Sequence, residues 1–463
     1  MRRGSMAGGA ADPLDVSRAS VLARVAYATG YLPLSAAFAT VKTHAQSVAL
    51  DVEGYAPVWV GRCFFGASVA VGCLEPVLGA WSDARAEREG PRGRAAILRV
   101  AAPVWVLAFG VLWAPGSPDV LKALALAAFF LSHAAVFLNW TALWPTFSHP
   151  ADRASVALLK QGAQAVGMGV GMAGAPALAG PGWVQRSRLA VFFPCLMAAC
   201  FFPPILAVDA LHLSRVSHSR PSSSEMGDGG FTLRRLGGSA LDILSSSPAL
   251  RLALLAASLN TLAVGCTTNA MPLYARYVLP EAMSSKDASG MTLALVATGM
   301  LAVPLWTVVV KRAGPERAWA AGCAVLSAGF ALLALAPSYA ASMACLGVAG
   351  LGTGGLFAAQ ELAVMAIVDQ DAAAHGGRRR DGLVAGLRAV GGHAGNAAQG
   401  LVFGAALQYA GFLPGDEHDE AQPTPAVRAI WGLASLAPSA CYALCVLCVL
   451  GLSRDLAAKR KAE

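Results

Sequence analysis

The sequence predicts an all-α polytopic membrane protein, because it is too apolar and too poor in charge for a soluble domain. Hydrophobic residues make up 56% of the 463 residues, charged residues make up 13%, and the mean hydropathy is +0.55. A soluble domain carries roughly 25% charged residues. Apolar runs long enough to cross a bilayer, such as 95–114 and 430–452, recur along the whole chain.

These runs predict twelve transmembrane helices arranged as two halves of six. The longest polar connection, 209–249, separates an N-terminal half at 20–208 from a C-terminal half at 250–452, with tails at 1–19 and 453–463. The connection is Ser-rich at first and then has leucines at helical spacing, which predicts an amphipathic helix on the membrane surface. The predicted spans are 20–42, 56–81, 96–114, 120–145, 154–180, 188–208, 250–279, 289–310, 318–336, 340–368, 383–412 and 429–452.

The distribution of charge predicts the orientation in the membrane. If the N-terminus is cytoplasmic, most Lys and Arg residues outside the spans lie in cytoplasmic segments, as the positive-inside rule requires. The connection at 413–425, "LPGDEHDEAQPTP", is acidic and falls on the opposite side. We therefore expect an integral, multi-pass protein with both termini in the cytoplasm. The net charge of +8 has the same explanation and does not indicate a nucleic-acid partner.

Motifs that indicate an enzyme, a cofactor or a metal do not stand out. "GLGTGG" at 350–355 fits the spacing of a dinucleotide-binding loop, but it lies within an apolar span, where small residues allow helices to pack closely. The cysteines all fall in apolar segments, so they predict neither a disulfide framework nor a metal site. We expect no catalytic residues, no cofactor and no metal.

Four ionisable residues in the middle of predicted spans are the candidates for function. Glu75 lies about 12 Å inward from Asp83 along a helix, and Glu361 repeats this spacing before Asp369. Lys160 and His393 lie at comparable depth in their spans. A charge at the bilayer centre costs at least about 2.5 kcal/mol, so such groups mark polar cavities, ion pathways or proton relays. The alternative is that a carboxylate is simply satisfied by neighbouring groups.

Several uncharged residues are weaker candidates for a solute site. Side chains in the fourth and seventh spans combine amide groups with aromatic faces that suit sugar rings. Helix packing is the alternative interpretation for each aromatic residue. The candidates are Asn139, Trp140, Trp144 and Asn269.

Three stretches then carry a resemblance to a known family. They are "EPVLGAWSDARAEREGPRGRA" (75–95), "LWPTFSHPADRASVALLKQGAQAVG" (143–167) and "AIVDQDAAAHGGRRRDGLVAGLRAVGGHAGNA" (366–397). In this order they resemble the major facilitator superfamily, and within it the glycoside–pentoside–hexuronide:cation symporter branch. The resemblance implies a carrier that rocks between inward- and outward-open states around a central site. It also implies a conformational latch in the loops, with Gly79, Asp83, Gly93, Arg94, Asp369, Arg379 and Arg380.

The resemblance also bears on the coupling cation. Glu75 falls where melibiose-type carriers have the second acid of their cation site, but Val71 replaces the first acid. His393 falls at the position of a common lysine. Loss of one acid favours a proton over sodium as the coupling cation.

The resemblance also bears on the solute. Lys160 falls where a sugar-contacting arginine stands, whereas Ser35 and Phe137 lie near the positions of two sugar-binding acids. Melibiose-like binding is therefore not implied.

These observations predict a proton-coupled symporter of a small organic solute, with sugars as the leading class and the lipid bilayer as its surroundings. The proposed roles are cation coupling for Glu75 and His393, and solute binding for the remaining central residues. A uniporter, a sodium-coupled carrier of a lipid or amino-acid-like solute, and a non-transporting receptor or scaffold of the same fold are the alternatives.

Overall fold

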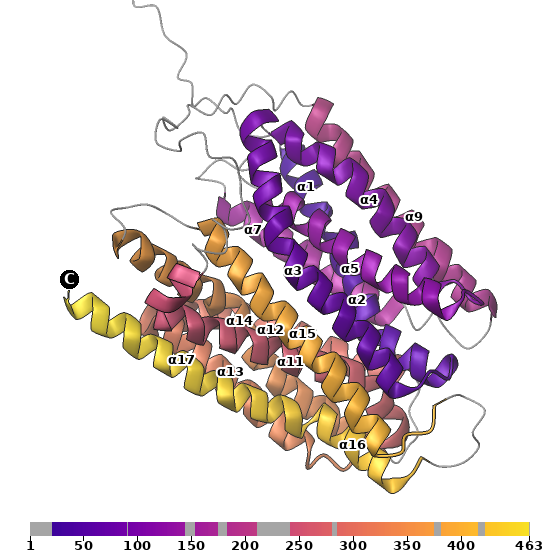
Figure 1. Ribbon diagram of the computed structural model, residues 1–463. Helices are drawn as coiled ribbons and strands as arrows, with labels where there is room; N and C mark the ends of the chain where they lie inside the picture. The colour runs from indigo at the N-terminus through magenta and orange to yellow at the C-terminus, as the bar shows by residue number, and fades with distance from the viewer. Residues whose placement is uncertain are drawn as a thin grey trace, which may run out of the picture.

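The protein is a pair of helical bundles, and all regular elements in its described part are helices (Figure 1). This confirms the predicted all-α class. Each of the twelve predicted spans overlaps a described helix. The computed structural model describes residues 21–89, 91–143, 153–174, 183–210, 241–279, 285–374, 381–414 and 422–462.

The N-terminal bundle contains the helices up to residue 210. α2 continues directly into a π-helical turn, η1, and α7 ends in a second one, η3. The elements are α1 (Val21–Thr29), α2 (Tyr31–Ser47), η1 (Val48–Val52), α3 (Pro57–Glu89), α4 (Pro91–Trp113), α5 (Asp119–Ala142), α7 (Arg153–Gly169), η3 (Val170–Gly174) and α9 (Trp183–Ala210).

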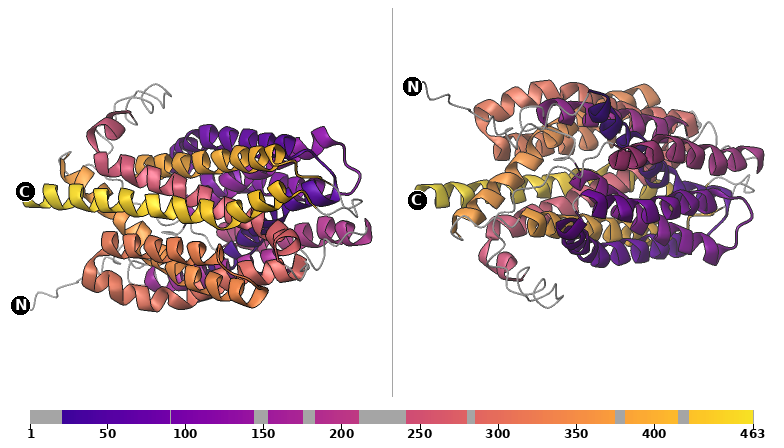
Figure 2. Two further views of the ribbon diagram at one scale, coloured as in Figure 1. Left: turned by 90° about the horizontal axis from the view of Figure 1, so that it is seen from below. Right: turned by 90° about the horizontal axis from the view of Figure 1, so that it is seen from above.

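The C-terminal bundle contains the remaining helices, and the views in Figure 2 show α17 extending beyond its neighbours at its C-terminal end. Ser247 caps α11 by accepting a hydrogen bond from the backbone N–H of Leu250 (3.3 Å). The predicted surface helix of the connection lies mostly outside the described residues. The elements are α11 (Pro248–Tyr277), α12 (Ser285–Ala313), α13 (Pro315–Leu333), α14 (Tyr339–Ala374), α15 (Asp381–Tyr409), α16 (Thr424–Ala434) and α17 (Leu436–Ala462).

Many of these helices are long enough to cross a membrane. Within the described ranges, seven helical segments are long and apolar enough to cross a bilayer by length and composition. They are Pro57–Gly79, Arg92–Trp113, Asp119–Ala142, Pro248–Tyr277, Gly290–Ala313, Tyr339–Gln370 and Thr424–Ala458.

The first predicted span ends too early. It was expected to stop at residue 42, but α2 and η1 continue to Val52. The polar sequence "KTHAQS" lowers the hydropathy there, which makes it look like a membrane boundary. In the fold this stretch faces other helices rather than lipid or water, and Lys42, His44 and Gln46 are buried.

Polar side chains of α2 contact the backbone carbonyls of the π-helical turn η3. A π-helical turn leaves backbone carbonyls without their usual helical partners. Thr40 donates a hydrogen bond to the carbonyl of Gly171 (3.2 Å), and the His44 Nε2 lies 3.0 Å from the carbonyl of Met172. A Cβ on Gly171 would lie 2.3 Å from the carbonyl oxygen of Ala36, so only glycine permits this approach. The turn is therefore satisfied by side chains of the neighbouring helix.

The glycine-rich run at 350–355 serves helix packing, as predicted. It lies within α14, where the helix passes between α12 and α13. A Cβ on Gly352 would lie 2.5 Å from the carbonyl oxygen of Gly322, and a Cβ on Gly354 would lie 2.6 Å from that of Gly299. Small residues thus bring three helix backbones together.

The two bundles meet mainly where α3 lies beside α15 (Figure 1). Close backbone contacts pair the start of α3 with the end of α15. A Cβ on Gly61 would lie 2.4 Å from the carbonyl oxygen of Gly400, and one on Gly404 would lie 2.6 Å from that of Pro57. We call this end of the molecule, marked by Pro57 and Gly404, the closed end.

Candidate functional site

Glu75 and His393 bridge the two bundles. Glu75 belongs to α3 and His393 to α15, and the Glu75 Oε2 lies 2.6 Å from the His393 Nε2. Their side chains are 13% and 20% exposed, so both are largely enclosed yet still reachable by solvent. Gly72 makes the approach possible, because a Cβ there would lie 3.0 Å from the His393 Cβ. Two residues predicted separately from their depth thus form one acid–base pair.

A buried lysine lies on the same interface. Lys42 of α2 is 9% exposed, and its Nζ donates a hydrogen bond to the Asn396 Oδ1 of α15 (2.5 Å). The ammonium group also lies over the rings of Phe38 (5.9 Å) and Phe130 (5.5 Å). Within the described part of the chain, no carboxylate lies within ion-pair distance of Lys42. The charge is held by an amide dipole and two aromatic faces.

A third pair continues the interface towards the closed end. The Gln399 Nε2 of α15 donates a hydrogen bond to the Gln46 Oε1 of α2 (3.2 Å), and both side chains are fully buried. The Gln399 side chain packs against Gly265 of α11, where a Cβ would lie 2.6 Å from its Cγ. We refer to the three cross-bundle pairs together as the polar seam: Glu75–His393, Lys42–Asn396 and Gln46–Gln399.

His133 of α5 lies behind the seam. Its ring stacks against Phe38 (5.0 Å between centroids) and Phe129 (5.8 Å). Its Nδ1 is buried without a hydrogen-bond partner, and the ring is an electrostatic neighbour of His393. His133 is therefore a further titratable group within electrostatic range of His393.

Lys42 and His133 were missed as candidates in the sequence. Lys42 was placed at the end of a span whose boundary was too early. His133 lies mid-way along an apolar span, and an ionisable residue at such a position is itself the signal that identifies a candidate. The amides of the seam carry no comparable signal, because Asn and Gln occur on many helix surfaces.

Two predicted solute-binding residues lie on facing sides of α2 and α7. The Lys160 Nζ of α7 lies 4.8 Å from the centre of the Tyr31 ring, and Lys160 is partly buried. Ser35 follows Tyr31 by one helical turn and is also partly buried, with its Cβ beside Gly167. The Tyr31 hydroxyl donates to Thr141 (3.1 Å). These groups form a second polar region, separate from the seam in the contacts described.

Three further candidates have partners inside the helix bundles. Asn139 accepts a hydrogen bond from Ser82 (2.7 Å) and donates to the carbonyl of Ala135 (2.8 Å), which ties α5 to α3. Trp140 is fully buried and stacks on Tyr27. The fully buried Asn269 donates to a carbonyl of its own helix, α11. In this conformation their visible role is helix packing.

The expected latch is described only in part. Arg94, at the start of α4, donates to the carbonyl of Ala142 at the end of α5. Gly93 lies against α3, because a Cβ there would be 2.7 Å from the carbonyl oxygen of Arg85. Gly79 lies beside α5, near Leu138, and Asp369 is exposed. Trp144, Arg379, Arg380 and the side chains of Asp83 and Glu361 lie outside the described residues.

Two helical bundles that meet along a seam of polar and ionisable side chains have the architecture of a secondary transporter. Among the described residues, no group of three or more His, Cys, Asp or Glu side chains is placed to hold a metal ion. The sequence matches the family described as MFS/sugar transport protein over residues 26–453. The chain belongs to this family, which confirms the resemblance to the major facilitator superfamily.

Solved transporter structures have the same fold at low sequence identity. A bacterial homologue of the human lysosomal transporter Spinster, inward-facing and unoccupied, is similar with a TM-score of 0.62 and 15% identity over 93% of this chain and 95% of that one. The nucleoside transporter NupG gives 0.63 and 9%, over 93% and 98%. A proton-dependent oligopeptide transporter gives 0.63 and 14%, over 94% and 99%. A search of curated protein sequences finds no significant match.

Proposed function

We propose that the protein is a proton-coupled symporter of a small organic solute, with sugars and related compounds as the leading class. The observation that carries this proposal is the 2.6 Å contact between Glu75 and His393 across the two bundles. A transporter couples proton binding to its conformational change when the titrating group forms a contact that exists in one state and not in the other. We propose that the Glu75–His393 contact is of this kind, because it joins helices of different bundles.

We assign the described conformation to the inward-facing state. The cross-bundle contacts run from Pro57 and Gly404 at the closed end to Glu75 and His393. If both termini are cytoplasmic, the closed end faces the outside. The similarity to a structure solved as inward-facing supports the same assignment.

The chemistry of the pair gives the direction of coupling. With one proton shared between the Glu75 carboxylate and the His393 imidazole, the pair forms a charge-assisted hydrogen bond. A second proton neutralises Glu75 and removes this attraction, so protonation favours separation of α3 from α15. We propose that Glu75 is protonated from the outside in the outward-open state and releases its proton to the cytoplasm before it pairs with His393.

A proton suits this site better than sodium. Sodium is a hard cation that requires several oxygen ligands, but the described surroundings of Glu75 contain no second carboxylate. Val71, at the position where the family resemblance places another acid, is 1% exposed and apolar. His133 adds a nitrogen base, which favours proton exchange.

The lysines indicate which groups of a solute would bind. Lys42 and Lys160 are partly or fully buried cations, and Glu75 is the carboxylate described in the seam. The excess positive charge favours solutes with hydroxyl or carboxylate oxygens, such as sugars and sugar acids. We assign Lys160, with Ser35 and Tyr31 near it, to solute binding.

The function is tested by counterflow in proteoliposomes that contain the purified protein. The solutes are sugars, sugar acids, amino acids and a lysophospholipid, each at about pH 6 and about pH 8, where histidine changes its charge. We expect at least one sugar or sugar acid to exchange, and its net uptake to follow an inward proton gradient and ignore sodium. Exchange of no solute would favour the scaffold alternative, and sodium-driven uptake would contradict proton coupling.

A further inference from the structure

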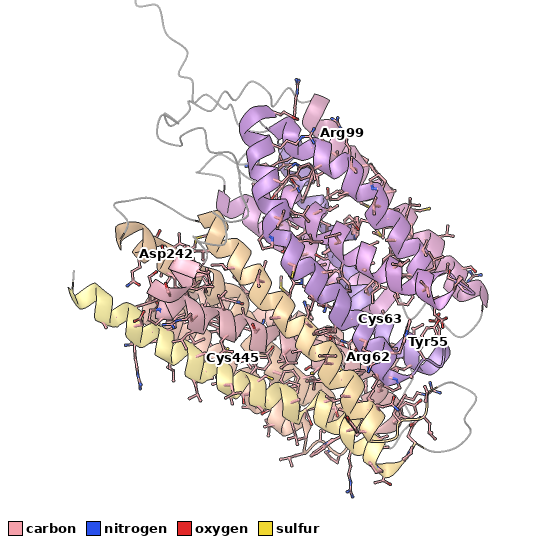
Figure 3. The ribbon with its side chains drawn as sticks, in the orientation of Figure 1. Tyr55, Arg62, Cys63, Arg99, Asp242 and Cys445 are labelled. Carbon is pink, nitrogen blue, oxygen red and sulfur yellow. The ribbon has the colours of Figure 1, made fainter. Side chains whose placement is uncertain are left out.

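A mostly apolar pocket lies within the N-terminal bundle at the closed end. Residues of α2, η1, α3, α4 and α5 line it, and none of the six residues of the polar seam is among them. Figure 3 shows Tyr55 and Cys63, which both line it, at the same end of the bundle. We call it the closed-end cavity.

The cavity has an apolar interior and a polar rim. Ala45, Phe64 and Leu126 form part of the interior. At the rim, Lys122 pairs with Glu53 across the gap between α5 and the turn before α3. The Lys122 ammonium and the Glu53 carboxylate thus neutralise each other.

The rim is fixed by further contacts before any ligand binds. Tyr55 donates a hydrogen bond to the Asp119 carboxylate (2.7 Å). The Tyr55 ring packs on the ring of Trp59 (4.9 Å between centroids), and the Lys122 Nζ lies 6.0 Å from the Tyr55 ring. A preformed rim lowers the entropy cost of binding.

One polar group of the wall lacks a partner. Trp113, the last residue of α4, is 4% exposed, and its indole N–H has no hydrogen-bond partner. A buried donor without a partner is unfavourable, so a ligand oxygen that accepts its hydrogen bond would be stabilised there. The Lys122–Glu53 pair, the apolar lining and this unsatisfied donor together define which ligand would fit.

We propose that the closed-end cavity binds an uncharged amphiphile with an apolar chain or ring body and a hydrogen-bond-accepting oxygen, such as a hydroxyl or an ester carbonyl. The apolar body fills the interior, and the oxygen accepts from the Trp113 N–H. A carboxylate head would compete with Glu53 for Lys122, and a cationic head would compete with Lys122 for Glu53. Charged amphiphiles of the same length therefore bind more weakly.

Cys63 provides a direct readout, because this free, partly buried thiol lines the cavity. The full-length protein in lipid nanodiscs is treated with N-ethylmaleimide, and labelling of each cysteine is followed by peptide mass spectrometry. The probes are 1-decanol, which enters from water, and monooleoylglycerol, which is resident in the bilayer. Decanoate and decyltrimethylammonium are the charged counterparts of decanol.

We expect 1-decanol to slow labelling of Cys63 at least about threefold and to leave the exposed Cys195 unchanged. Trp113→Phe keeps the ring but removes the donor, and it should weaken the protection about two- to tenfold. Ala123→Leu fills part of the cavity and should abolish the protection of Cys63 by 1-decanol. Protection by monooleoylglycerol as well would identify membrane lipid as a source of the ligand.

If Cys63 reacts too slowly to measure, quenching of tryptophan fluorescence by 10-bromo-1-decanol gives the same information. Trp59 and Trp113 line the cavity, so the quenching should fall in Ala123→Leu. The proposal is overturned if decanol slows Cys63 and Cys195 equally, if it protects neither, or if quenching is the same in wild type and Ala123→Leu. Equal protection by decanoate would overturn the assignment to uncharged ligands.

Discussion

Glu75→Gln is expected to abolish solute accumulation driven by a pH gradient while exchange of solute across the membrane continues. Glutamine has nearly the size and shape of a protonated glutamate but cannot release a proton. The carrier can then change conformation with solute bound, but no step depends on the proton gradient. For one proton per solute, a gradient of one pH unit supports up to about tenfold accumulation. In the variant, the internal solute concentration should stop at the external one.

The matched control is Glu89→Gln. Glu89 is also a glutamate of α3, but it is exposed and pairs with Arg85 one turn away on the same helix. Surface pairs of this kind contribute little to stability. We expect normal accumulation in this control. Accumulation by Glu75→Gln at the wild-type level would contradict the role assigned to the Glu75–His393 pair.

Gly61→Leu is expected to reduce net transport at least about tenfold without unfolding the protein. Gly61 lies where α3 meets α15, and a Cβ there would fall 2.4 Å from the Gly400 carbonyl oxygen. Backbone atoms cannot yield as a flexible side chain can, so the closed end could no longer form this contact. Each bundle remains packed internally, because the clash lies between the bundles. The carrier should therefore stay open at this end.

Gly66→Leu is the control, because a Cβ on Gly66 of the same helix meets nothing within 4 Å. Val120 and Tyr409 are exposed residues near the closed end, one in each bundle. The distance between labels attached at these two positions reports how far apart the bundles lie at this end. We expect a longer mean distance in Gly61→Leu and the wild-type distance in Gly66→Leu. Wild-type distance and transport in Gly61→Leu would show that this contact does not limit the cycle.

The fold could be predicted from the sequence because a membrane helix is a local feature. Each span needs about 20 apolar residues, and hydropathy detects such runs directly. The first span shows the limit of this method. Lys42 and Gln46 are polar but face other helices, and hydropathy does not distinguish a polar residue in water from one that is buried against a partner.

The candidate site was predictable as a set of residues but not as a set of contacts. Depth along a helix identified Glu75 and His393 separately. Their contact joins positions 318 residues apart and depends on how α3 packs on α15, which glycines such as Gly72 permit. Asn139 and Trp140 show the opposite case. Their residue types predict solute binding, and in the described conformation their hydrogen bonds and burial show only contacts that pack the helices together.

Proton movement that accompanies solute uptake tests the central proposal most directly. Proteoliposomes in weakly buffered medium with an external pH dye receive the solute identified by counterflow, with no proton gradient imposed. We predict alkalinisation of the medium in step with solute uptake for the wild type and for Glu89→Gln, and no pH change for Glu75→Gln. Solute uptake by the wild type without alkalinisation, or equal alkalinisation by Glu75→Gln, would contradict proton coupling through Glu75.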